Sequence, residues 1–457
     1  TLIPQFKLHV MEHLYECRDK PPGFAQRKFN FTLCVGPELM FPEARGIVWD
    51  ARQWAPDPQT NTGPGIVPYD FAPWDSTGAE CIDTHLEVMD LIAQLDDHDD
   101  KALHSHLRYG VHYSAELVLQ LCFMPHLLSL STGFISVQSE LARLAELGWY
   151  EVFTRIPIWP SLMHGQGSTA RKLTSNARRT SEYGQPGRDP DRPVLPVVSV
   201  RPDGSCQYAP TPVISLNRAS KDSGWPREQK VFLSELLLSL CILLHAATCL
   251  HTHVYCFGDD FKDFFNQLKT HPATHWQSCL VTLPFNDVDA ELVYVLETVL
   301  GFGVVCGSNV AQRLADALVW LFHKWFDEEE DALLHATQPA DWLAWRASRA
   351  AACSQAARKC GRLYCIYIYT DDVFAFVVGP HRQWRAIRMW ATVVKRFNFI
   401  MATAVKRQCG TMLTALGASV STVLALVQLQ KAKTLAVLAD LTELLQGRMQ
   451  AMQWWRK

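Results

Sequence analysis

The sequence YCIYIYTDDVFAFVV, at residues 364–378, is the strongest local signal in the chain. Aromatic, β-branched and other apolar residues fill its two arms, and Thr370, Asp371 and Asp372 lie between them. Two such arms around a short polar stretch predict a β-hairpin with two adjacent carboxylates at its tip. Most paired aspartates are exposed turn residues, but like charges at the end of a buried hairpin repel each other unless a cation offsets them.

A further carboxylate follows another run of strand-forming residues. Residues 253–257, HVYCF, lead into Asp259 and Asp260. Mg²⁺ binds through oxygen ligands, usually one or two carboxylates together with substrate phosphates. We therefore expect Asp260 to lie beside the hairpin and to complete a metal site with Asp371 and Asp372.

Five short motifs, in the family's order over residues 260–433, resemble those of the reverse transcriptases of retroelements. They are DFKDFF at 260–265, FG at 302–303 with GS at 307–308 and Gln312, YTDD at 369–372, Lys406 with Gly410 and LG at 416–417, and Leu429 with Lys433. The last motif is similar to that of pararetroviruses and tyrosine-recombinase retrotransposons. The resemblance implies an α/β (α+β) right-hand polymerase, with an antiparallel palm sheet, helices on one face of that sheet, and fingers.

The resemblance also implies RNA-directed DNA synthesis in a retrotransposon polyprotein, by two-metal nucleotidyl transfer to a primer 3′-hydroxyl. Asp260 and Asp371 would then bridge two Mg²⁺ ions, or Mn²⁺ in their place. Asp372 would be the auxiliary acid and the Phe261 carbonyl a further metal ligand. The implied partners are an RNA template, a DNA or RNA primer, and dNTPs.

Other matched positions imply roles in nucleotide binding. Phe265 stands at the steric gate, where a bulky ring excludes a 2′-hydroxyl, although an ordinary core phenylalanine is the alternative. Gly303 and Gln312 would line the template–nucleotide pocket, where a glycine lets the backbone approach closely. Lys406 would be either the general acid for pyrophosphate departure or part of a basic surface.

The fingers are expected within residues 155–192, a segment rich in Gly, Pro and Arg. Lys172 and Arg179 would both reach a triphosphate if the segment forms a hairpin. A solvated basic loop is the rival interpretation. The sequence RPDG at 201–204 is another candidate for the tip, but Gln207 stands where an arginine is expected.

Several positions depart from the family's pattern. Gly301 and Ser308 replace usual prolines, and Ala311 replaces a usual aromatic residue. The sequence shows no ribonuclease H or integrase signature, and little chain follows for a thumb. Two alternatives therefore stay open: a catalytically inactive, nucleic-acid-binding relic of a retroelement, and an RNA-directed RNA polymerase, against which Phe265 argues.

Length and composition are those of a globular protein with several domains. The 457 residues are 48% hydrophobic and 19% charged, which excludes a disordered chain. We predict a mostly helical accessory module at 1–150, a fingers-like region at 151–250, the palm at 251–425, and the start of a thumb or connection at 426–457. A protein-interaction role for the accessory module is a third possibility.

The net charge of −3 argues against nucleic-acid binding when it is taken as an average. Residues 1–150 carry 20 acidic and 10 basic side chains, so the remainder has a charge of +7. Residues 373–439 contain nine basic and no acidic residues, which predicts a surface along a nucleic-acid backbone, with a solvated basic helix as the alternative. The acidic run 327–331 is expected to be a solvated insertion.

The sequence also suggests a compartment. None of the 14 cysteines forms a CxxC pair, so free thiols in a reducing compartment are expected. The chain begins at Thr1, as a fragment would, without a secretory signal, and the apolar run 231–250 is interrupted by polar residues. We expect a soluble intracellular protein, cytoplasmic or nuclear, with no membrane partner.

Overall fold

A computed structural model describes residues 2–19, 32–35, 84–113, 121–124, 126–127, 129–154, 161–170, 177–182, 197–200, 206–209, 216–217, 220, 225, 228, 230–285, 291–337, 343–344, 347, 361–429, 434–435, 438–439 and 442. These residues form helices and several antiparallel sheets, which confirms the predicted mixed α/β class. They divide into two compact units. The first unit comprises the described parts of 1–93, 99–228 and 265–311, and the second those of 94–98, 229–264 and 312–457. This division differs from the predicted domain limits after 150, 250 and 425, which stay predictions.

An eight-stranded mixed sheet is the main sheet of the first unit, in the order β3-β11-β10-β4-β2-β1-β7-β8. Its strands are β1 (Thr32–Val35), β2 (Leu121–Phe123), β3 (Tyr150–Phe153), β4 (Ser161–Met163), β7 (Val197–Val200), β8 (Cys206–Ala209), β10 (Cys279–Thr282) and β11 (Val293–Glu297). The N-terminal 150 residues thus contribute strands that pair with later ones, as in the parallel pairs β1–β7 and β2–β4. They also form the helices α1 (Leu2–Asp19), α3 (Val88–Gln94), α4 (Lys101–Tyr109) and α5 (Leu130–Glu146).

The basic segment predicted for the fingers does contain a hairpin. Strand β5 (Gly165–Ala170) pairs with β6 (Ala177–Glu182) in antiparallel register, with Ser168 opposite Arg179. Helix α5 packs against both strands. Lys172 and the sequence at 201–204 lie outside the described residues.

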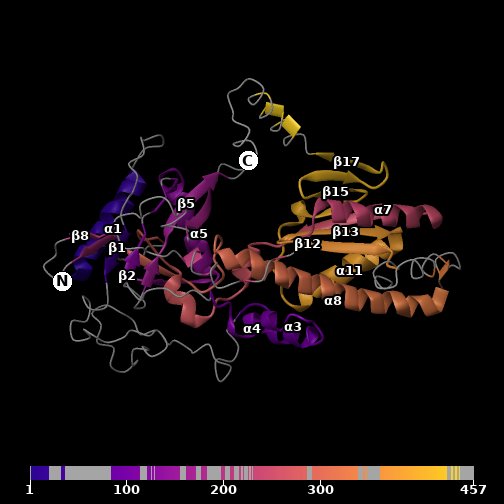
Figure 1. The fold of residues 1–457 in the computed structure, drawn as a ribbon, viewed down its shortest axis with the longest axis horizontal. Coiled ribbons are helices and arrows are strands. Elements are labelled where there is room, and N and C mark those ends of the chain that lie inside the picture. The colour runs from indigo at the N-terminus through magenta and orange to yellow at the C-terminus, as the bar shows by residue number, and fades with distance from the viewer. Residues whose placement is uncertain are drawn as a thin grey trace. The chain divides into compact units, whose positions relative to one another are not determined.

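A four-stranded antiparallel sheet forms the core of the second unit (Figure 1), in the order β12-β13-β9-β14. Its strands are β9 (Val254–Asp260), β12 (Tyr364–Tyr369), β13 (Asp372–Val378) and β14 (Gln408–Gly410). Every residue of β12 pairs with a residue of β13, which confirms the predicted hairpin. Strand β9 pairs with β13 on the other side, as expected for the run that ends at Asp260.

Helices cover both faces of this sheet, so the expectation of helices on one face is wrong. All residues of β13 after Asp372 are buried, which requires a cover on each side. Phe374 and Phe376 join the apolar cluster under α7 (Leu233–Cys249). Helix α11 (Pro380–Arg396) packs on the opposite face, where the Trp390 indole donates to Asp259.

The acidic run 327–331 lies within helix α8 (Val305–Thr337), so the predicted solvated insertion is wrong. Glu330 is 7% exposed and pairs with Arg382 and Arg385 of α11. Glu329 pairs with Arg385 and Arg388. These three arginines therefore neutralise acids of the same unit, which is why the acid-free stretch presents less free positive charge than its composition suggests.

The chain after α11 returns to the sheet and then forms a second small sheet. The turn η4 (Ala404–Lys406) leads into β14, and the strands β15 (Met412–Ala415), β16 (Ala418–Ser421) and β17 (Leu426–Leu429) pair in antiparallel register. Among the described residues, no helix has both the length and the apolar character that a membrane crossing requires.

Candidate active site

The pairing of β9 with β13 brings two of the predicted aspartates together. Asp260 and Asp372 are direct partners at the end of the ladder. Directly opposed residues of an antiparallel pair point to the same face, with Cβ atoms about 4.5–5.5 Å apart. Alternation along the strands places both on the α7 side, whereas Asp259, which is opposite Val373, points to the α11 side. The sequence-based expectation that Asp260 lies beside the hairpin is confirmed.

Asp371 lies in the two-residue turn Thr370–Asp371 that joins β12 to β13. Its carbonyl accepts a hydrogen bond of 3.0 Å from the Phe261 N–H, which ties the turn to the end of β9. Thr370 has a φ of +59°, a left-handed conformation that is uncommon for a β-branched residue. The turn therefore needs support from its surroundings.

Gln312 of α8 supplies this support. Its Nε2 donates to the Ile368 carbonyl at 2.9 Å, and its Oε1 accepts from the Thr370 N–H at 2.9 Å. The side chain is 1% exposed, and Nε2 also donates to Asp316. The residue that was expected in the nucleotide pocket thus has its amide bonded to the hairpin backbone.

Two successive cations contact the two successive aspartates at the end of β9. Lys406 forms an ion pair with Asp260, and Arg407 donates to Asp259 at 3.3 Å. Strand β14 directly follows them and pairs with β9, with Gln408 opposite Gly258. The register thereby places both cations beside the acidic end of β9, and sequence spacing alone did not predict these pairs.

Burial and the neighbouring acids raise the pKa of the Asp372 carboxyl group. Although the residue is exposed overall, desolvation of the carboxyl group and the nearby charges of Asp371 and Asp260 raise its pKa to about 6. Lys406 acts in the opposite direction and lowers this pKa. A cation bound at this site would offset the repulsion among these carboxylates.

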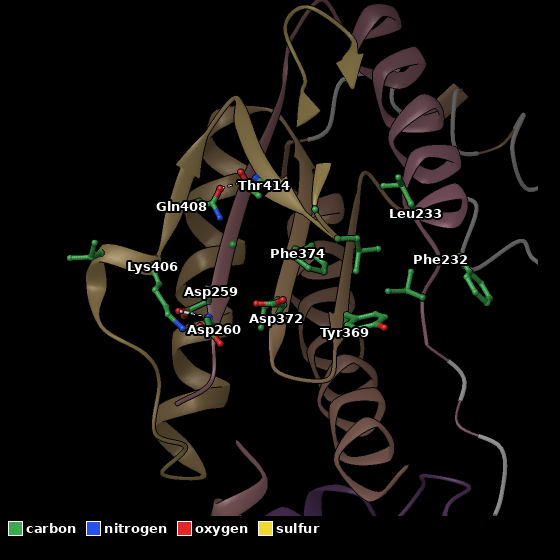
Figure 2. A pocket seen from close by; sticks show the side chains of 16 residues that line it. Phe232, Leu233, Asp259, Asp260, Tyr369, Asp372, Phe374, Lys406, Gln408 and Thr414 are labelled. Atoms are coloured by element: carbon green, nitrogen blue, oxygen red, sulfur yellow. Dashed lines mark hydrogen bonds and ion pairs between the residues drawn. The ribbon is translucent and has the colours of Figure 1, made fainter. Parts of the chain in front are cut away.

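Asp260 and Asp372 line a pocket of about 900 Å³ within the second unit (Figure 2). Asp260 and Lys406 lie on one side of it, and Tyr369, Leu233 and Phe232 lie on the other. Gly258 also lines it, and a Cβ atom there would meet Leu413 Cδ1 at 2.7 Å. That atom is the end of a flexible side chain, so a larger residue at position 258 would require Leu413 to shift.

The exposed aromatic ring of Phe232 was not predicted from the sequence. It is 68% exposed at the start of α7, and its backbone N–H donates to Glu235 at 2.8 Å. The only sequence signal was an aromatic residue followed three positions later by glutamate, which is compatible with many helix starts.

Phe265 and Gly303 belong to the first unit. The Phe265 ring contacts Phe302, with centroids 5.6 Å apart, and a Cβ at Gly307 would lie 3.3 Å from Phe265. Gly303 has a φ of +111°, and its carbonyl accepts from Asn217 at 2.9 Å. Their contacts with a nucleotide stay predictions, as do those of Arg179. Lys433 lies outside the described residues.

The donor set is suited to a hard divalent cation. Asp260 and Asp372 offer carboxylates on one face, and a Lys406 ammonium already stands at Asp260 as a positive charge. In the part of the chain that the structure describes, no group of three or more His, Cys, Asp or Glu side chains is arranged to hold a metal. Two carboxylates with substrate phosphates are nevertheless a usual Mg²⁺ environment, so the residues fit once Lys406 leaves Asp260.

The sequence matches no known family model and no curated protein. The structure is similar to a foamy viral protease–reverse transcriptase in complex with double-stranded DNA, with a TM-score of 0.41, 11% identity, and coverage of 79% of this chain and 50% of that chain. Two structures of the prototype foamy virus protease–reverse transcriptase also match. The CSH mutant matches with a TM-score of 0.35 and 12% identity, over 67% of this chain and 27% of that chain. The native protein matches with a TM-score of 0.34 and 12% identity, over 70% of this chain and 28% of that chain. The chain spans half or less of the length of each.

Proposed function

We propose that the acidic pocket catalyses nucleotidyl transfer to a primer 3′-hydroxyl, and that the protein is an RNA-directed DNA polymerase of a retroelement polyprotein. The observation that carries the proposal is the convergence of Asp260, Asp371 and Asp372 at one end of the paired central strands β9 and β13. Paired carboxylates at such a position suit phosphoryl chemistry, which depends on positioning and charge stabilisation. The ordered motifs over 260–433 support the choice of polymerase within that class.

Asp260 and Asp371 would hold the two metal ions, with Asp372 as the auxiliary acid and the Phe261 carbonyl as a further ligand. Bound Mg²⁺, or Mn²⁺ in its place, would activate the 3′-hydroxyl and offset charge on the leaving pyrophosphate. The chain's own contribution is rigidity, because Gln312 fixes the turn that presents Asp371. When it is not paired with Asp260, Lys406 would donate a proton to the departing pyrophosphate.

The substrates follow from the same proposal. An RNA template, a DNA or RNA primer and dNTPs would be bound, with Lys172 and Arg179 on the triphosphate and Gly303 at the template–nucleotide pocket. Phe265 would exclude ribonucleotides, so Phe265→Ala should raise the incorporation of ribonucleotides relative to deoxynucleotides. An RNA-directed RNA polymerase would show no such change.

One observation favours the alternative of an inactive nucleic-acid-binding relic. Lys406 pairs with Asp260, so the chain itself offsets the charge of one of the three predicted metal ligands. Primer extension on an RNA template with Mg²⁺ and dNTPs separates the two functions. The polymerase proposal requires extension that Asp371→Asn abolishes, and the relic would bind nucleic acid without extension.

A further inference from the structure

The wall of the acidic pocket opposite Lys406 is apolar and aromatic. Phe232, Leu233 and Tyr369 line it, and Phe232 lies farther from the carboxylates than Tyr369 (Figure 2). Single exposed apolar side chains are common and need no explanation. Phe232 differs from them because its 68% exposed ring belongs to the wall of a charged pocket.

Hydrogen bonds fix the main chain at Phe232, from which the ring projects. The residue has an extended conformation, with a φ of −93° and a ψ of 153°, directly before α7. Its N–H donates to Glu235 Oε2, and its carbonyl accepts from the N–H of Glu235 at 3.0 Å and of Leu236 at 3.2 Å. Since Leu236 is fully buried in the core under α7, the ring projects from a fixed point.

A lysine ammonium group lies beside this aromatic surface. The Lys230 ammonium lies 5.2 Å from the centroid of the Tyr369 ring. An aromatic face beside a cation is the combination by which proteins bind single-stranded nucleic acid, because a base stacks on the ring while the cation attracts the backbone.

We propose that Phe232 is a stacking platform for a nucleobase of the bound nucleic acid, next to the reacting position. This inference rests on the proposed function, which places the nucleic-acid strand at the carboxylates. Tyr369 lies between the Phe232 ring and Asp372, so the stacked base is a neighbour of the reacting nucleotide. The same chemistry suits a primer base or a template base.

The test measures binding of the full chain to a fluorescein-labelled DNA primer on an RNA template with a single-stranded overhang. Phe232→Ala should weaken binding about 5- to 140-fold, the range for loss of one stacked base. Phe232→Trp should retain binding, and Phe232→Leu should behave like the alanine variant because it keeps apolar area without a flat ring. Leu238→Ala is the matched control, since Leu238 is 64% exposed on the same helix and does not line the pocket.

Two further readouts separate stacking from other effects. Lys230→Gln should lower the slope of log Kd against log salt by about 1, whereas Phe232→Ala should leave the slope unchanged. 2-Aminopurine placed at the last three primer positions, or in the template opposite them, should be quenched by the wild type at one position and not by Phe232→Ala. The quenched position identifies the strand.

Equal binding by Phe232→Ala and the wild type would overturn the inference, as would an equal loss in Leu238→Ala or the absence of quenching at every position. Failure of the proposed function gives a different result. In that case the wild type would bind, Phe232→Ala would bind more weakly, and no primer extension would occur.

Discussion

The side chain of Gln312 bonds to the backbone on both sides of the Ile368–Tyr369–Thr370 bend. Its Nε2 donates to the Ile368 carbonyl and its Oε1 accepts from the Thr370 N–H, each at 2.9 Å. The positive φ of Thr370 is thereby stabilised from a helix rather than by the turn's own sequence. We infer that Gln312 positions Asp371 and Asp372.

Gln312→Ala should lower the free energy of unfolding by about 2–4 kcal/mol, because two buried backbone groups lose their partner. Urea denaturation followed by tryptophan fluorescence measures this change. Catalytic turnover should fall while the KM for dNTPs changes little. A raised KM with unchanged stability would instead support a direct nucleotide contact by Gln312.

Lys406→Met should strengthen divalent metal binding about two- to fivefold, since the partly exposed ammonium competes for Asp260. Calorimetric titration of the protein with Mn²⁺ in the absence of nucleic acid measures this effect. Arg407→Met is the control, because Arg407 contacts Asp259 on the other face of the sheet. Weaker metal binding by Lys406→Met would show that the lysine assists the site rather than competing with the metal.

Glu330→Gln should destabilise the protein by about 3–5 kcal/mol. It removes the carboxylate that pairs with Arg382 and leaves Arg385 with Glu329 as its acidic partner. Glu328→Gln, at an exposed position two residues earlier on the same helix, should change stability by less than about 0.5 kcal/mol. Thermal and urea unfolding of both variants test this difference. Equal stability of the two variants would contradict a structural role for the acidic run.

Acidification should destabilise the first unit through its buried histidines. Burial lowers the pKa of His275 to about 4 and that of His126 to about 3, whereas the unfolded chain titrates near 6.5. Unfolding therefore takes up protons below about pH 6.5, and stability falls as the pH drops toward 4. Melting temperatures between pH 7.5 and 4.5 measure the loss. His275→Gln should flatten the dependence, whereas His245→Gln, at an exposed site, should not.

The hairpin at 364–378 and the strand ending at Asp260 could be predicted because each is a long apolar run that stops at acids. Their pairing also followed, since the metal hypothesis needs both ends together. The support from Gln312 could not be predicted, because it depends on how α8 packs beside the end of β12. The Lys406–Asp260 and Arg407–Asp259 pairs likewise depend on the register of β14 against β9.

The charge pattern was misleading for a physical reason. An acid-free stretch reads as a nucleic-acid surface only if its cations stay exposed, and Arg382 and Arg385 instead pair with Glu330 of α8. These residues are more than 50 positions apart along the chain, so no local window contains the pairs. Net charge by segment could not distinguish an internal ion-pair network from a binding surface.

The central claim is that the aspartates at 260, 371 and 372 catalyse RNA-templated DNA synthesis. The most direct measurement is extension of a labelled primer on an RNA template with Mg²⁺ and dNTPs, by the wild type and by Asp371→Asn at equal folded concentration. We expect template-dependent extension by the wild type and a loss of at least about a hundredfold in the variant. No extension by the wild type, or equal extension by Asp371→Asn, would contradict it.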